Sequence, residues 1–196
     1  MSALARAKSR PRPASQAVAL SIGLSALGVA LSVWLPTGIP IGPIRAQPFQ
    51  AMINVLAGVL VGPGYGVIVA LVISLLRNVF GVGTFFAFPG SVFGVFLVGY
   101  FYHYVRKTDH AAWLEIVGTV CVGATVAYYL AASLAGPTKI AGFMAIAPFK
   151  AFPLAGVGSI AGLFGLWIAF AIGSVPGAII GYVVLKALRL TGALEV

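Results

Sequence analysis

The sequence predicts an all-α, polytopic membrane protein in which about six transmembrane helices form one bundle. Of its 196 residues, 61% are hydrophobic and only 8% are charged, whereas soluble domains carry about 25% charged residues. Mean hydropathy is +1.08, and the apolar residues form runs long enough for membrane helices, joined by short links. This composition excludes a soluble enzyme domain, a disordered chain and a disulfide scaffold.

The first span is expected over residues 17–35, after a basic cytoplasmic segment over 1–15. The apolar run is longer than the core of a signal peptide, and no small-residue cleavage site follows Trp34. We therefore expect it to be retained as a membrane helix. A single transmembrane domain is predicted over 16–190, and a short C-terminal tail over 191–196.

A segment rich in proline and glycine, 36–43, then predicts a stiff outer loop that ends near Gln47. Spans 2 and 3 are expected over 48–61 and 65–80, separated by a tight turn at Gly62-Pro63-Gly64. Both spans are short for a bilayer, which favours partial burial among the other helices.

A second outer loop separates span 3 from span 4, which is expected over 89–104. Span 5 is expected over 112–134. The irregular stretch 136–158 is predicted to be an outer loop with a re-entrant or interfacial helix. The last span lies within 160–190, where Pro176 is expected to produce a kink.

Six spans place both termini on the same side, which is the cytoplasm if the basic N-terminal segment lies there, and the distribution of basic residues agrees with this orientation. Eight of the twelve lysines and arginines then lie inside, namely Arg6, Lys8, Arg10, Arg12, Arg106, Lys107, Lys186 and Arg189. The net charge of +9 is therefore attributed to membrane orientation and not to a nucleic-acid partner. We expect a multi-pass protein of the cell membrane.

Polar side chains gather on the expected outer side, which predicts a ligand site there. Gln50 and Asn54 are four residues apart and share one helix face. Amides can donate and accept hydrogen bonds, and an arginine can bind an acceptor or stack on a flat ring. Such a pocket suits a small heteroaromatic solute. The predicted solute-binding residues are Gln50, Asn54, Arg77, Asn78, Thr84 and Phe88, with Arg45, Gln47, Lys139 and Lys150 on the same side.

An alternative explains each residue separately: Arg77 extends to the membrane interface, and Asn54 caps or bridges helices. No catalytic or metal-binding group is predicted, because the two histidines, His103 and His110, make a poor metal site and are expected at the membrane interface, and Cys121 is the single cysteine. Glu115 is expected at the cytoplasmic start of span 5, where a carboxylate suits a helix N-terminus. With no acid placed deep in a span, an enzyme and a proton-coupled carrier are both disfavoured.

One segment of the sequence resembles the signature of a known family. The run Arg77–Ser91, RNVFGVGTFFAFPGS, is similar to that of ThiW-type proteins, and shorter matches cover most of 47–178. A histidine often follows the glutamine of the PFQ motif in this family, whereas this chain has Ala51. The shorter matches are Pro48-Phe49-Gln50, Asn54-Val55, Gly62-Pro63, Glu115 with Gly118-Thr119, and Ser174-Val175-Pro176-Gly177-Ala178.

This resemblance implies a substrate-binding (S) subunit of an energy-coupling factor (ECF) transporter, which captures hydroxyethylthiazole or a related thiamine precursor and performs no chemistry. Such subunits have about six helices and dock, through small residues of the first helix, on a transmembrane coupling subunit that joins two cytoplasmic ATPases. Here the docking residues would be Ala17, Ser21 and Ser25, or Ala19 and Gly23. No cofactor is implied. The alternatives are a stand-alone small-solute channel or facilitator and, more remotely, a membrane enzyme or assembly factor.

Overall fold

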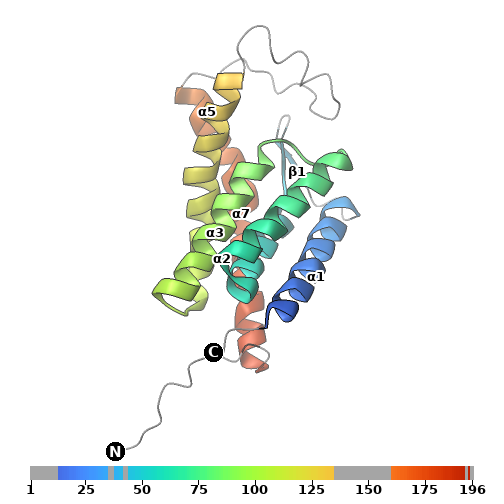
Figure 1. Cartoon of the computed structure of the whole chain (residues 1–196). Coiled ribbons are helices and arrows are strands. Elements are labelled where there is room, and N and C mark those ends of the chain that lie inside the picture. The colour runs from blue at the N-terminus through green and yellow to red at the C-terminus, as the bar shows by residue number, and fades with distance from the viewer. Residues whose placement is uncertain (1–12, 35–37, 42–43, 135–159, 193, 195–196) are drawn as a thin grey trace, which may run out of the picture.

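The structure is a computed structural model that describes the chain except for residues 1–12, 35–37, 42–43, 135–159, 193 and 195–196 (Figure 1). Most of the basic N-terminal segment and the predicted irregular stretch 136–158 therefore lie outside the described residues. The helices are α1 (Ala14–Val33), α2 (Pro48–Val79), α3 (Ala87–Tyr100), α4 (Leu114–Ile116), α5 (Ala124–Leu134) and α7 (Ile160–Leu190).

Short segments of other helix types extend these helices. The π-helical segment η1 (Phe101–Val105) continues α3, while the 3-10 segment η2 (Asp109–Trp113) and the π-helical segment η3 (Val117–Gly123) flank α4. As a result η2, α4, η3 and α5 follow one another along one rod. The predicted kink site, Pro176, lies inside α7, which runs through it.

The loop predicted before Gln47 contains two short strands, β1 (Ile39–Ile41) and β2 (Ile44–Ala46), which pair in antiparallel fashion. Their isoleucines are β-branched and favour extended backbone, a local preference that the proline and glycine content of the segment obscured. The hairpin leads directly into α2 at Pro48.

Helix α2 folds back on itself at Gly62, whose φ of 84° interrupts the helical backbone. Gln50 donates a hydrogen bond of 3.0 Å to Ser74, which is 24 residues away, although a straight helix would separate them by about 36 Å. The arms 48–61 and 63–79 are therefore antiparallel. Glycine tolerates positive φ, so the tight turn predicted at Gly62-Pro63-Gly64 is confirmed.

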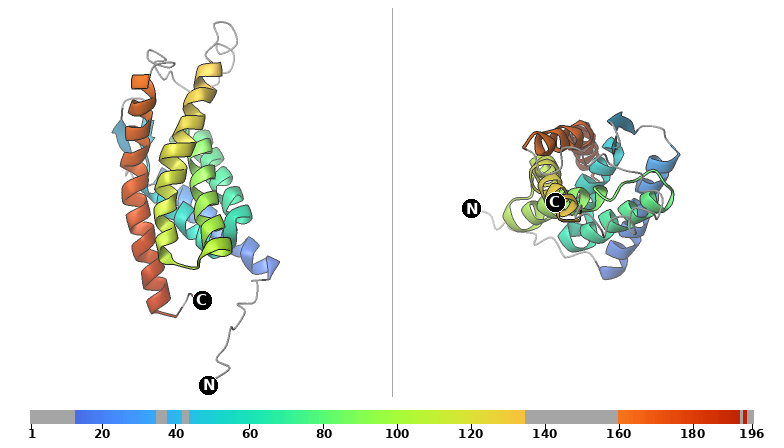
Figure 2. Two further views of the ribbon diagram at one scale, coloured as in Figure 1. Left: turned by 90° about the vertical axis from the view of Figure 1, so that its left-hand side faces the viewer. Right: turned by 90° about the horizontal axis from the view of Figure 1, so that it is seen from above.

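Both arms of α2 contribute to the centre of the bundle, and α2 packs against α1, α3 and α7 (Figure 2). Ile53 on the first arm, Ile73 on the second and Val98 on α3 are fully buried together. At Gly99 a Cβ atom would lie only 2.7 Å from the backbone nitrogen of Pro63. The turn of α2 and the backbone of α3 thus meet almost without intervening side chains.

Within the described residues, four helices are long and apolar enough to cross a membrane: Ala14–Val33, Pro48–Val79, Asp109–Leu130 and Leu163–Leu190. This number is lower than the predicted six because α2, with both its arms, counts once, and because α3 has only 14 residues. The chain is a multi-pass helical membrane protein.

Two ends of the bundle can be distinguished in Figure 1. Helix α1 begins and helix α7 ends at one end, here called the terminal end. The β-hairpin and the loop 80–86 lie at the opposite end, here called the hairpin end. The candidate site opens from the hairpin end toward the middle of the bundle.

Candidate functional site

A cavity of about 70 Å³ lies between both arms of α2, the start of α3, the rod that contains α4, and α7. Its lining is unusually polar for the interior of a membrane bundle, where buried polar groups commonly mark function. The polar and aromatic lining residues are Gln47, Gln50, Asn54, Arg77, Thr84, Phe86, Ser91, Glu115, Thr119, Phe170 and Ser174.

Gln50 joins three helical segments on one side of the cavity. Its Nε2 atom donates to the hydroxyl of Ser74 on the second arm of α2 and to the hydroxyl of Ser91 on α3. All three side chains are buried. This amide therefore holds the two arms and α3 in register around the cavity.

Asn54 lies one helical turn deeper than Gln50 and points to a buried carboxylate. Its Nδ2 atom donates to Oε1 of Glu115 over 3.3 Å, the hydroxyl of Thr119 lies 2.8 Å from the same oxygen, and the hydroxyl of Ser174 donates to Oε2. Thr119 also lies 3.0 Å from the carbonyl oxygen of Gly90. Its single hydroxyl proton can serve only one of these acceptors at a time.

The expectation that no acid lies deep in a span is wrong, because Glu115, predicted at the cytoplasmic start of span 5, lies in the interior of the bundle. Its side chain is fully buried, and its partner Ser174 lies near the middle of α7. The 3-10 segment Asp109–Trp113 precedes α4, so Glu115 lies inside the rod and not at its end. The argument against a carrier with a deep carboxylate therefore no longer holds.

Arg77 lines the cavity near the hairpin end, and its side chain is only 3% exposed. Extension of this guanidinium to the membrane interface is therefore ruled out. Its Nε atom is buried without a hydrogen-bond partner among the described residues. The ion pair found in the described part of the chain joins Arg189 to Asp109, so Arg77 and Glu115 share the cavity without pairing.

Two further lining residues have buried polar atoms without a partner in the described structure, at Oε1 of Gln47 and Oδ1 of Asn54. A buried polar atom that makes no hydrogen bond costs about 1–3 kcal/mol. With the guanidinium of Arg77, the cavity therefore presents one donor and two acceptors that a small polar ligand, or water, would satisfy.

Asn78 lies outside the cavity lining but supports it. Its Nδ2 atom donates to the carbonyl oxygen of Ser74 over 2.7 Å and to that of Thr84 over 3.3 Å. Thr84 itself lines the cavity. Asn78 thus fastens the loop after α2 to the last turn of that helix.

The remaining predicted residues divide between the cavity and other places. Phe88 packs beside Phe85, with ring centroids 6.1 Å apart, and lies outside the lining. Phe86 and Phe170 supply the aromatic walls instead. Lys139, Lys150 and the side chain of Arg45 lie outside the described residues.

The sequence offered a signal for Glu115 that the prediction did not use. Thr119 follows it by four residues, which places both side chains on one helix face. Gly94 makes room on the facing helix, because a Cβ atom there would lie 3.1 Å from Oε1 of Glu115. Ser174, however, is 59 residues away, and only the packing of α7 brings it to the carboxylate.

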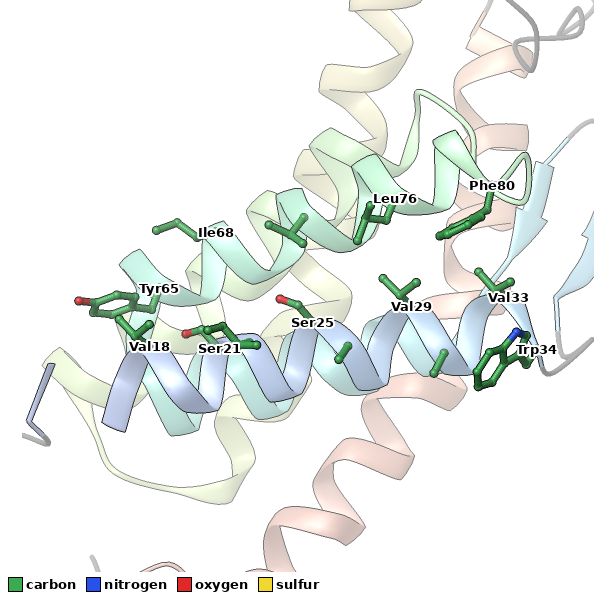
Figure 3. Close-up of a pocket in the computed structure, with 14 residues that line it drawn as sticks. Val18, Ser21, Ser25, Val29, Val33, Trp34, Tyr65, Ile68, Leu76 and Phe80 are labelled. Atoms are coloured by element: carbon green, nitrogen blue, oxygen red, sulfur yellow. The ribbon is translucent and has the colours of Figure 1, made fainter. Parts of the chain in front are cut away.

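A larger groove, of about 850 Å³, runs between α1 and the second arm of α2 (Figure 3). Its lining is almost entirely apolar, and Val29, Ile68 and Leu76 are typical members. It carries no charged side chain. Such a surface suits lipid or another helix, so the polar cavity is the better site for a hydrogen-bonding solute.

The predicted docking residues of α1 lie on different faces. Ala17 and Ser21 are buried, and Ser21 donates a hydrogen bond to the backbone of Ala17. Ser25 is half-buried and lines the apolar groove. Ala19 and Gly23 are exposed, and a Cβ atom at Gly23 would meet nothing within 4 Å. Ala19 and Gly23 thus face outward, whereas Ser21 and Ser25 line the apolar groove.

A multi-pass helical bundle that encloses a small cavity with unsatisfied hydrogen-bonding groups fits the class of membrane proteins that carry small solutes. Comparison with protein families identifies the particular group: the model of the thiamine-precursor transporter protein (ThiW) family matches residues 18–165. The chain belongs to this family, as the run Arg77–Ser91 indicated, and is a transporter and not an enzyme. Neither the curated proteins nor the solved structures contain a match.

Proposed function

We propose that this chain is the S subunit of an ECF-type transporter and that its polar cavity binds hydroxyethylthiazole or a close thiamine precursor. Membership of a thiamine-precursor transporter family supports the class of solute. The observation that carries the proposal is one cavity in which Nε of Arg77 and the amide oxygens of Gln47 and Asn54 are buried without a hydrogen-bond partner among the described residues. Hydroxyethylthiazole supplies a ring nitrogen as acceptor and a hydroxyl as donor for such groups.

Each part of the cavity then has a role in binding. Phe86 and Phe170 flank the flat ring, while Arg77 donates to the ring nitrogen. The volume of about 70 Å³ is far below the roughly 300–1,000 Å³ of common ligand pockets. We infer that part of the lining moves aside on binding and that the ligand is small.

We further propose six membrane crossings, with each arm of α2 as one crossing and α3 with η1 as another. Both termini then lie in the cytoplasm, and the hairpin end faces outward in the cell membrane. The cluster of cations at the terminal end supports this orientation, because cytoplasmic ends carry excess lysine and arginine. Its described members are Arg106, Lys107, Lys186 and Arg189.

Two measurements test this function. Calorimetry on the purified chain should detect hydroxyethylthiazole binding at one site per molecule. Uptake into proteoliposomes should require the coupling subunit, both ATPases and ATP. Lack of thiazole binding would contradict the solute assignment, and ATP-dependent uptake by the chain together with its partners would support the ECF assignment.

The second candidate function is a carrier that works alone, and the buried Glu115 favours it, since carboxylates deep in a membrane are common in proton-coupled transport. Proteoliposomes that contain only this chain discriminate between the two. Accumulation of thiazole driven by a pH gradient, and lost in Glu115→Gln, would establish the carrier. Uptake that merely equilibrates would indicate a facilitator.

A further inference from the structure

We propose that Glu115 is a specificity-determining residue: it accepts a hydrogen bond from the free hydroxyl of the ligand, so the site takes the alcohol and rejects its phosphate ester. This inference rests on the proposed function and deepens it, because the family assignment names a thiamine precursor without its phosphorylation state. It follows from the position and the hydrogen bonds of one buried side chain.

The carboxylate retains capacity to accept another hydrogen bond. Among the described residues, its Oε1 atom accepts hydrogen bonds from Asn54 and Thr119, whereas its Oε2 atom accepts one from Ser174. A carboxylate offers about four acceptor positions. Within the described residues its partners are an amide and two hydroxyl groups, and none of them is a cation. A donor group from the ligand would complete this shell.

The cavity is polarised along its length. Arg77 lies in the last turn of α2, close to the hairpin end, while Glu115 lies deeper, beside the middle of α7. An acceptor on the ligand therefore suits the outer part of the cavity and a donor suits the inner part. Hydroxyethylthiazole has a ring nitrogen and, on a two-carbon arm, a hydroxyl, which match this order.

Phosphorylation of that hydroxyl removes the donor and adds between one and two negative charges. In the inner part of the cavity the phosphate would lose its hydration beside Glu115, where the described lining offers no cation to compensate its charge. A buried acceptor left without its donor costs a further factor of roughly ten to one hundred in affinity. The ester is therefore disfavoured by both charge and lost hydrogen bonding.

The test measures affinity for four probes by calorimetry on the purified full chain: hydroxyethylthiazole, its methyl ether, the analogue with an ethyl group in place of hydroxyethyl, and the phosphate ester. Wild type should bind the alcohol roughly ten- to one-hundredfold more tightly than the ether or ethyl analogue, and should not detectably bind the ester. In Glu115→Gln the preference for the alcohol should shrink several-fold and the ester should gain affinity. Asp109→Asn, at the terminal end, is the matched control and should keep the wild-type preferences.

The possible outcomes distinguish a failure of this inference from a failure of the proposed function on which it rests. Equal affinity for alcohol and ether in wild type, or an unchanged preference in Glu115→Gln, overturns the role of Glu115 while thiazole binding stands. If no probe binds, both the function and this inference fail. The comparison of the four probes in wild type can refute the inference by itself. The test therefore remains decisive even if the Glu115→Gln protein does not fold.

Discussion

At the scale of single residues, the buried charge of Arg77 favours ligand binding but lowers the stability of the ligand-free protein. A guanidinium that is 3% exposed and has no ion-pair partner in the described structure is costly in the ligand-free protein, because burial removes its hydration. A ligand that supplies an acceptor recovers part of this cost. The residue therefore contributes to affinity while it lowers the stability of the empty bundle.

Replacement of Arg77 by methionine should separate these two effects. Methionine fills similar space without a charge. The free energy of unfolding without ligand should therefore be unchanged or rise by about 1 kcal/mol or more in Arg77→Met. Affinity for hydroxyethylthiazole should fall at least about tenfold, because a charge-assisted hydrogen bond is lost. Arg106→Met, at an exposed position, should change neither thermal unfolding nor calorimetry. Retained affinity in Arg77→Met would remove this arginine from the site.

Asn78 should behave in the opposite way, because its hydrogen bonds lie within the fold. Asn78→Ala deprives the carbonyl oxygens of Ser74 and Thr84 of a donor, so stability should fall by about 1–2 kcal/mol. Asn78→Asp should cost a similar amount, since an ionised carboxylate cannot donate. Thermal unfolding in detergent measures both. A melting temperature equal to that of wild type would show that the loop does not depend on this amide.

Local periodicity predicted part of the site and could not predict the rest. The four-residue spacing of Gln50 and Asn54 placed both on one face, and both line the cavity. Glu115 was misplaced because its depth depends on η2 and on a contact with Ser174, 59 residues away. Phe86 and Phe88 are two positions apart in the sequence. Phe86 lines the cavity and packs against the cluster that contains Leu166 of α7, a contact that local sequence does not predict.

At the scale of elements, close approach of backbones holds α2 to α3. Gly58 and Gly99 face each other, and a Cβ atom at Gly58 would lie 2.9 Å from the nitrogen of Gly99.

Hydropathy and glycine–proline pairs sufficed to predict most helices and the turn at Gly62. The β-hairpin was missed because three-residue strands carry too little pattern to be distinguished from a loop.

Gly99→Ala should therefore disturb the bundle more than an alanine at an open glycine. The new methyl group would press on the backbone of Pro63, and such overpacking costs about 1–3 kcal/mol. Gly64→Ala is the control, because its Cβ would meet nothing within 4 Å. Thermal unfolding should rank Gly99→Ala below wild type and Gly64→Ala close to it. Equal stability of both variants would contradict the observed helix contact.

At the scale of the whole molecule, the exposed stripe of α1 offers a surface for a partner while the cavity lies elsewhere in the bundle. Ala19 and Gly23 point away from the other described helices, whereas Ala17 and Ser21 pack inward. If the proposed ECF function holds, binding of solute and binding of the coupling subunit are separable properties of this chain.

Gly23→Leu should separate them experimentally. The larger side chain has room in the isolated chain, so thiazole affinity and thermal stability should stay close to wild type. Co-purification with the coupling subunit should be lost, because small residues permit close helix approach. Gly165→Leu is the matched control, since Gly165 is an equally open position on α7. Undiminished co-purification of Gly23→Leu would place the docking surface on another face.

The reversal at Gly62 also bears on how the chain enters the bilayer during synthesis. The first arm of α2, 48–61, is shorter than the about 20 residues of an independent membrane helix, and a single residue of positive φ joins it to the second arm. No hydrophilic linker, at which the insertion machinery could pause, lies between the two arms. We expect both arms to leave the translocon together as one helical hairpin, already carrying Gln50, Asn54 and Arg77 of the cavity lining.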